Sequence, residues 1–357
     1  MKILQRYMLS EFLKLLAIAG AGFLVLFITV DLFENMDNLI KHDVPFFAAF
    51  SFFLYKVPFI IGQVSPIAAL VASLLSLGLL SKHGEITAMK AGGVKLLKAV
   101  YPLLAAGLAI SLAVILMNEY VAPAALKKAD SFRNKWFGEH GGTFGREGLW
   151  VKTNEGILNV KHVDFANDRL YGITYFIIGK PFSLSGRVQA KSAAWTGEQW
   201  VAEGATAWAF TEGAEAAREE RAEYVLSGVV EPEELVNMEN FQQNLSFADL
   251  RAYVKELEKE GYEATKYKID LWDKLTFPLV NFIMVLVGIP FALKTGRHSG
   301  IAAGVGLSIV IAFSYWGVFA LTRSLGQAQM VPPVVAAVFP DLLFLAIGAL
   351  MIGYVKE

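Results

Sequence analysis

The sequence predicts a membrane α-helical protein with six transmembrane helices and an inserted all-β, jellyroll-like domain. Three apolar spans precede a long polar stretch of alternating residues, and three more apolar spans follow it. The chain of 357 residues is 55% hydrophobic and only 18% charged, which is less charge than a soluble domain usually carries. The layout and the composition together favour a multi-pass membrane protein.

Each apolar span is long enough to cross a hydrocarbon core of ~30 Å. The spans cover approximately residues 12–33, 52–80, 98–121, 274–294, 301–322 and 335–355. The first is preceded by Lys2 and Arg6, as in a signal peptide, but its apolar run continues to Val30. A signal-peptide core has only ~7–15 residues, so we expect an uncleaved first helix.

Basic residues gather in alternate loops, and this asymmetry predicts the orientation of the chain. They are frequent before span one and after spans two and four, whereas the opposite short loops offer Lys41 and Arg323. Because cytoplasmic loops carry the excess of Lys and Arg, both termini are expected in the cytoplasm. The insert then lies outside, which in a bacterium is the periplasm or the cell surface.

Short runs rich in β-branched and aromatic residues indicate that the insert is a β domain. The runs are 149–151, 157–160, 171–176, 187–190, 199–202 and 205–210, and residues 212–223 are expected to form a charged loop or edge. Turn residues separate the runs, as in a sandwich, a jelly roll or a partly open barrel. The tryptophans of the insert either line an apolar groove or fill the core, and core filling is favoured.

A helix is expected after the β domain, because Ser246–Asp249 resembles a capping box. Leu250, Tyr253, Val254 and Leu257 share one face of this helix, which is expected to lie on the outer membrane surface. The predicted parts of the chain are spans one to three at 1–121, the β domain with its lead-in at 122–245, a connecting helix at 246–272 and spans four to six at 273–357.

The residues present exclude several kinds of chemistry. The chain has no cysteine, which rules out disulfides and thiolate ligands. Leu293 stands where a Walker A loop needs the glycine before its lysine. The five histidines lack the spacing of a zinc site, and a net charge of −1 argues against nucleic acid. We therefore expect no catalytic residue, cofactor or metal in this chain.

Ionisable residues inside the apolar spans are expected near the span ends. They are Asp31, Glu34, Lys56, Asp273, Lys274 and Asp341. Asp341 is interpreted as an interfacial residue on the outer side. An ion-coupled transporter usually places such groups at mid-membrane, so the pattern does not favour one.

The loop after span two contains a short predicted helix within residues 83–93. Glu85 lies in its first turn, where the helix dipole stabilises an acid, and Gly92 and Gly93 end it. Exposed Ile86 and Met89 could dock in a groove of a soluble partner. The alternative is a solvated loop helix in which Glu85 is only an N-terminal charge.

Several segments of the chain resemble the YjgP/YjgQ family, the LptF and LptG permeases of the lipopolysaccharide exporter. The matching segments are Gly84–Gly93 (GEITAMKAGG), Ser65–Leu70 (SPIAAL), Asn118–Pro123 (NEYVAP), Arg146–Trp150 (REGLW), Tyr267–Lys274 (YKIDLWDK) and Val331–Pro333 (VPP). They follow the family order along essentially the whole chain. The opening of the insert at Gly148-Leu149-Trp150 is more similar to LptG than to LptF.

The resemblance implies a non-catalytic half-transporter of a Gram-negative inner membrane. It implies pairing with a paralogous LptF-type permease, and an LptB-type ATPase dimer that binds ATP and magnesium and supplies the energy. The periplasmic jellyroll would pass lipopolysaccharide to LptC-type and LptA-type proteins. In this family the 83–93 segment is the coupling helix, so the resemblance makes Glu85, with Ile86 and Met89, the contact to the ATPase.

Cations near the outer rim are the candidates for binding lipid phosphates, and arginine suits a forked contact. The resemblance implies that Lys41 and Arg133 face the cavity, and Lys127 and Lys128 follow span three closely. Glu34 stands where LptG chains carry lysine, and Phe59 replaces another such residue, which implies a different phosphate pattern. The alternative is that these lysines are surface residues whose charged ends reach water.

The candidates for the acyl-chain cavity are Phe27, Phe59, Ile67, Phe313 and Trp316. Such apolar stripes are also typical of ordinary helix packing.

The hypothesis that follows is a permease subunit of an ATP-driven exporter, which extracts lipopolysaccharide from the membrane. The alternatives are a membrane sensor or scaffold, with a ligand-binding β domain, and a membrane hydrolase.

Overall fold

The computed structural model describes residues 2–136, 142–145, 148–153, 155–164, 168–179, 183–210, 217–226, 229, 245–259, 261, 263–295 and 301–354. The chain divides into two compact units. Residues Met1–Ala125 and Thr265–Glu357 form the helical unit, and Leu126–Ala264 form the β unit.

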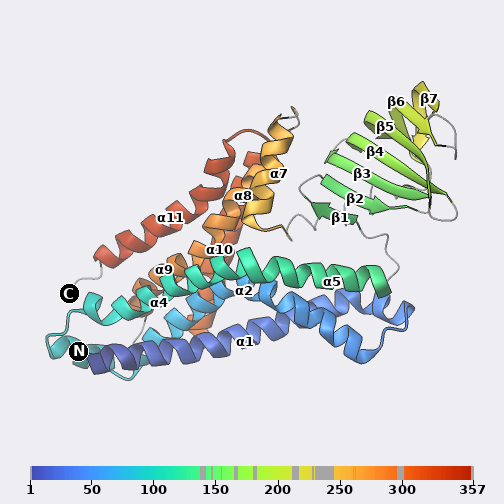
Figure 1. Ribbon diagram of the computed structural model, residues 1–357. Helices are drawn as coiled ribbons and strands as arrows, with labels where there is room; N and C mark the ends of the chain where they lie inside the picture. Colours follow the sequence, from blue (N-terminus) through green and yellow to red (C-terminus); the bar gives the residue numbers. More distant parts are fainter. Residues whose placement is uncertain are drawn as a thin grey trace. The chain divides into compact units, whose positions relative to one another are not determined.

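Within the described chain, six stretches of helix are long and apolar enough to cross a membrane, as predicted. Their main helices are α1 (Lys2–Lys41), α2 (Phe46–Lys82), α4 (Leu96–Leu116), α9 (Val280–Thr295), α10 (Ile301–Gln327) and α11 (Pro333–Tyr354). We call the end where α1 begins and α2 ends the N-terminal end of the unit, and the end where the chain passes from α1 to α2 the turn end (Figure 1).

Helices α2 and α9 form the centre of the helical unit. In the most apolar stretches of α2 and α9, 72% and 67% of the residues are buried, against 0% for α1. A Cβ at Gly288 of α9 would lie 2.7 Å from the Ser73 hydroxyl of α2, and that hydroxyl donates to the Val285 carbonyl at 3.3 Å. Small residues thus let the two backbones approach closely, as is common in membrane bundles.

Two irregular turns shape the helices that lead into and out of the insert. The π-helical turn η1 (Met117–Val121) joins α4 to α5 (Ala122–Trp136), and α8 (Thr265–Thr276) reaches α9 through the 3₁₀ turn η3 (Phe277–Leu279). Pro123 follows η1 as the second residue of α5, and Pro278 lies within η3; the ring and missing amide hydrogen of each disturb the α-helical ladder. Just after η3, the Phe282 amide donates to Ser111 Oγ of α4 at 3.2 Å.

The β unit contains one antiparallel sheet in which the described strands follow one another as a meander. The strands are β1 (Gly142–Gly145), β2 (Gly148–Lys152), β3 (Gly156–Asp164), β4 (Arg169–Gly179), β5 (Ser183–Trp195), β6 (Trp200–Ala209) and β7 (Ala217–Leu226) (Figure 1). The predicted all-β insert is confirmed. The strand order adds that each described strand pairs only with its neighbours in sequence, whereas a jelly roll has Greek-key connections.

One detail of the sheet differs from the sequence prediction, because the runs 199–202 and 205–210 belong to one strand, β6. Of the two alternatives for the charged segment near residue 220, a loop or an edge, the structure shows the edge strand β7. Exposed charges cover most of β7, which is a common protection of a sheet edge.

Helix α7 (Phe247–Lys259) begins at the predicted cap, where the Asp249 amide donates to Ser246 Oγ at 3.1 Å. The apolar face of this helix packs inside the β unit, and its expected place on the outer membrane surface stays a prediction. The four apolar residues of that face are at most 6% exposed within the protein, and Tyr253 donates to the Lys161 carbonyl of β3 at 2.8 Å.

Candidate functional site

A short helix at the N-terminal end, α3 (Glu85–Ala91), carries the predicted coupling residues. Gly84 precedes it with a φ of 77°, in the left-handed region that favours glycine. Glu85 is half-buried and accepts a hydrogen bond of 3.3 Å from the Tyr7 hydroxyl of α1. Helix α3 therefore touches α1 directly after the chain turns out of α2.

The expected exposure of Ile86 is wrong, because this side chain is 5% exposed and belongs to the core of the helical unit. Met89 packs partly buried against the same core. Both residues anchor α3 from beneath, so the face available to a partner is formed by the exposed residues Thr87, Ala88, Lys90 and Ala91. A seven-residue segment does not form a stable helix in water by itself. The buried side chains of Ile86 and Met89 therefore stabilise α3.

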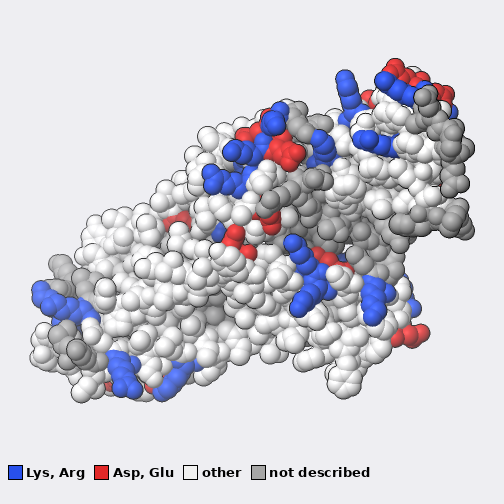
Figure 2. Space-filling view, in the orientation of Figure 1, with Lys and Arg blue, Asp and Glu red and all other residues white. Residues whose placement is uncertain are grey.

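Basic side chains gather at the N-terminal end of the helical unit (Figure 2), the end to which α3 belongs. Lys82 precedes it, Lys90 lies within it and Lys95 follows it, and all three are exposed. The surface that presents Glu85 is therefore rich in positive charge.

An ion pair joins α1 and α2 in the half of the helical unit that contains the turn end. Lys56 Nζ lies 2.8 Å and 2.9 Å from the two carboxylate oxygens of Asp31. Asn35 donates to the same carboxylate at 3.2 Å, and the Lys56 ammonium lies 4.5 Å from the centre of the Phe52 ring. Asp31 is 9% exposed, so the pair is a protected contact between two membrane helices.

A second polar cluster links α8, α10 and α11. Arg323 donates to Asp270 and to Asp273, and Tyr315 donates to Asp341 at 2.7 Å. Asp341 is 7% exposed and so lies inside the helical unit, while its place at the membrane interface stays a prediction. It is buried because α10 covers it and supplies a hydroxyl partner.

The four predicted phosphate-binding cations lie on two helices. Lys41 is exposed in the last turn of α1. Lys127 and Lys128 are exposed on α5, and Arg133 is half-buried on the same helix. The helix thus brings three of the four candidates into one short segment.

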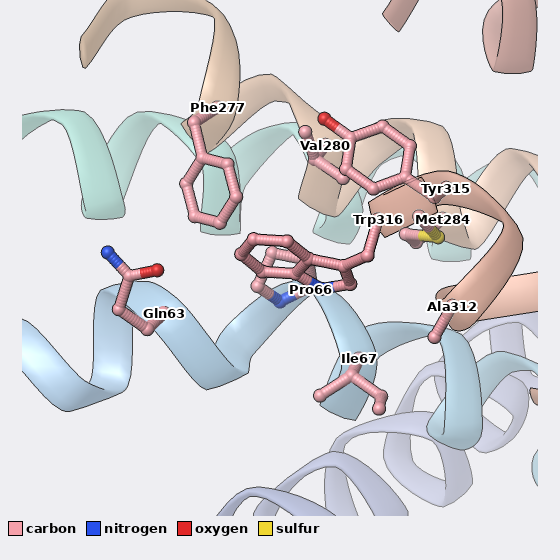
Figure 3. A pocket seen from close by; sticks show the side chains of 9 residues that line it. All are labelled: Gln63, Pro66, Ile67, Phe277, Val280, Met284, Ala312, Tyr315 and Trp316. Carbon is pink, nitrogen blue, oxygen red and sulfur yellow. The ribbon is translucent and has the colours of Figure 1, made fainter. Parts of the chain in front are cut away.

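Of the five predicted acyl-chain residues, Ile67 and Trp316 line one pocket (Figure 3). The pocket lies between α2, the α9 region and α10, with Pro66 on one side and Phe277 and Tyr315 on the other. Its volume is about 20 Å³, which is close to the space of a single water molecule and too small for an acyl chain. Trp316 also belongs to an aromatic cluster, with ring centres 5.9 Å from Phe277 and 5.6 Å from Phe319.

The other three acyl-chain candidates lie outside the described lining of this pocket. Phe27 of α1 is 39% exposed and Phe313 of α10 is 75% exposed, while Phe59 of α2 is half-buried. Phe27 and Phe313 therefore present aromatic surface to whatever surrounds the helical unit.

The β unit holds a cation between aromatic rings that the sequence did not single out. The guanidinium of Arg187 lies 5.8 Å from the ring centre of Phe176 and 5.5 Å from that of Trp208. The strand register places these three residues side by side on β4, β5 and β6. The predicted core role holds for Trp200, which is 1% exposed, whereas Trp150, Trp195 and Trp208 are half-buried.

These features define a multi-pass membrane protein with a β-sheet insert, polar contacts between its helices and no group of three or more potential metal ligands among the described residues. The family model of the lipopolysaccharide export system permease LptF/LptG matches residues 6–354. The chain belongs to this family, and the resemblance noted in the sequence is confirmed.

Curated relatives carry the same family assignment. The lipopolysaccharide export system permease protein LptG of Escherichia coli (strain K12) is 24% identical over 305 residues, covering 83% of this chain and 82% of the relative. The protein of the same name from Haemophilus influenzae is 20% identical over 339 residues, covering 94% and 92%. The chain is thus a transporter subunit of the inner membrane, a permease for lipopolysaccharide export.

Proposed function

We propose that this chain is one of two membrane subunits of an ATP-driven exporter, and that it transmits the motion of a partner ATPase through α3. The anchoring of α3 carries the proposal, because Ile86 lies in the core formed with α2, α4 and α9. A force applied to the exposed face of α3 would therefore act on the central helices of the unit. ATP and its magnesium ion would bind the partner, an LptB-type ATPase dimer, and this chain would supply no catalytic group.

The proposed orientation places the N-terminal end in the cytoplasm and the β unit in the periplasm. Exposed Lys82, Lys90 and Lys95 support it, because positive residues favour the cytoplasmic side. The orientation makes α3 accessible to a cytoplasmic ATPase.

The second membrane subunit would be a paralogous LptF-type permease that covers α1 and α10. The most apolar stretch of α1 is 0% buried and that of α10 is 22% buried, so both helices offer apolar surface. A cavity for acyl chains would form between the two subunits, lined here by Phe27, Phe313 and Trp316. This arrangement would supply the volume that the small pocket of a single chain lacks.

The lipid would leave through the β unit toward LptC-type and LptA-type proteins. Lys41, Lys127, Lys128 and Arg133 are the proposed phosphate contacts at the outer side. Arg187 between two aromatic rings offers a charge and an apolar surface together, which suits an amphipathic lipid.

The coupling role can be tested by purifying tagged wild-type chain and Glu85→Ala from native membranes and quantifying the copurified ATPase by mass spectrometry. We expect at least a tenfold loss of ATPase in the variant, with the partner permease retained. Glu11→Ala is the matched control, since Glu11 is also an acid on the N-terminal end and pairs with Lys14.

An ATPase level that is equal in wild type and Glu85→Ala would contradict the coupling role. Wild-type chain that carries no ATPase would instead favour the sensor or scaffold.

A further inference from the structure

An open apolar groove runs between α1 and α4 and starts at the N-terminal end of the helical unit. Its volume is about 760 Å³, within the ~300–1,000 Å³ typical of ligand sites. The residues that line it are Gln5, Arg6, Leu9, Leu13, Tyr101, Pro102, Ala105, Ala106, Ala109, Ile110 and Ala113. None of the residues assigned to lipopolysaccharide or to the ATPase lines this groove.

The lining changes from polar to apolar along the groove. Gln5, Arg6 and Tyr101 lie where the groove starts, at the N-terminal end of the helical unit. Gln5 also donates to the Lys98 carbonyl at 3.0 Å and so links α1 to α4. Toward mid-membrane the floor consists of alanines, of which Ala105, Ala109 and Ala113 are exposed. An amphiphile with a polar head and an apolar tail matches this gradient.

The length of the groove matches one leaflet of a bilayer. From Tyr101 to Ala113 the helical rise is roughly 18 Å, and half of a hydrocarbon core is about 15 Å. An acyl chain that lies on the alanine floor would therefore end near mid-membrane, with its headgroup at the level of Arg6.

We propose that this groove binds one glycerophospholipid of the leaflet at the N-terminal end, with an acyl chain on the alanine floor and the phosphate at Arg6. Arg6 is exposed and has no acidic partner among the described residues, so its guanidinium is available for a charge-assisted contact with phosphate. A transmembrane helix of a partner would have to place its own apolar residues across Arg6 and Gln5. The charge therefore favours a lipid over a helix.

The site can be probed directly because the chain has no cysteine. Ala109→Cys and Leu112→Cys each introduce a single thiol that can carry a benzophenone. Leu112 is the matched control, since it lies on the same helix, is 53% exposed and does not line the groove. The full chain is illuminated in nanodiscs of phosphatidylglycerol and phosphatidylethanolamine, and the adducts are identified by mass spectrometry.

We expect phospholipid adducts at residue 109 to exceed those at residue 112 at least fivefold. Equal lipid labelling at the two positions would show ordinary surrounding lipid and overturn the proposal. Adducts at residue 109 that consist of protein, in chain illuminated in native membranes, would overturn it in favour of a partner helix.

The headgroup contact has a separate readout. Combining Ala109→Cys with Arg6→Gln is expected to lower the phosphatidylglycerol adduct at least threefold, whereas Lys82→Gln, an exposed cation at the same end, leaves it unchanged. Equal losses in both variants would contradict a phosphate site at Arg6. None of these outcomes depends on the ATPase, so the lipid site and the proposed coupling role succeed or fail separately.

Discussion

Single charged residues in this chain act through partners that are distant in sequence. Lys56 meets Asp31 across 25 residues, and Arg323 meets Asp273 across 50. The sequence showed these residues near span ends but not the pairing, because nothing local encodes which helices become neighbours. Burial turns each pair into a specific contact between helices, since a charge that loses its partner in such a place is costly.

Arg323→Ala is expected to destabilise the helical unit by about 3 kcal/mol, because it leaves Asp270 and Asp273 without their shared cation. Adding Asp273→Asn should recover part of the loss by removing one of the two carboxylates. Thermal unfolding of the purified chain measures both effects. Lys41→Ala, an exposed cation, should leave the unfolding midpoint nearly unchanged, and an equal loss there would argue against the cluster.

The Tyr175 phenol is expected to make the stability of the β unit decrease with rising pH in the alkaline range. Burial raises the pKa of its phenol above the ordinary value, and its hydroxyl shares a hydrogen bond of 3.1 Å with Thr153 Oγ1. The unfolded chain therefore loses this proton first, and stability falls as the pH rises above about 10.

Tyr175→Phe should flatten this part of the pH dependence, measured by thermal unfolding between pH 8 and 11 with tryptophan fluorescence as the signal. Tyr120→Phe is the control, because Tyr120 is 72% exposed in the helical unit. A slope that is unchanged by Tyr175→Phe would exclude this phenol as the titrating group.

Individual elements were recognised from the sequence as far as their periodicity reached. The six spans follow from the length of their apolar runs, and helix α7 follows from its capping box together with the spacing of its apolar residues. For β7 the sequence leaves a loop and an edge open, because its charged residues hide the alternation that identifies a buried strand. For α3, the pattern predicted a helix but not which face is buried, since a seven-residue segment has too few apolar positions to fix its orientation.

Ile86→Ala tests whether burial of the Ile86 side chain in the core holds α3 in place. Removing most of a buried isoleucine should cost about 2–5 kcal/mol, seen as a lower unfolding midpoint of the isolated chain without any ATPase. Thr87→Ala, an exposed change on the same helix, should have little effect on stability. Full stability of Ile86→Ala combined with lost ATPase binding would restore Ile86 as a docking residue.

At the scale of the whole molecule, the helical unit has a buried centre and an apolar outside. The apolar stretches of α2 and α9 are mostly buried, whereas that of α1 is not buried at all. A subunit of a larger membrane assembly would show this difference in burial. Composition and hydropathy could predict the six spans, but not which helices would be left uncovered, because burial depends on tertiary packing.

A photoreactive residue in place of Phe313, which is 75% exposed, is expected to crosslink to a second permease in native membranes. The same residue in place of Leu112 of α4 should give no such protein adduct. The molecular mass and peptide composition of the adducts identify the partner. Adducts consisting only of lipid at both positions would argue that α10 faces the bilayer and not a subunit.

The central contact between α2 and α9 also has a consequence for how the chain is made. Residues 73 and 288, which touch in the finished protein, are separated during synthesis by the entire insert. The first three spans therefore enter the membrane while their main packing partner is still unmade, and the close approach at Ser73 stays open until the last third of the chain emerges. The meander, whose strands each pair with their neighbours in sequence, can close as it is synthesised, because local contacts form fast. The topology thus predicts assembly from the middle outward, with the insert folding first and the C-terminal helices completing the membrane core.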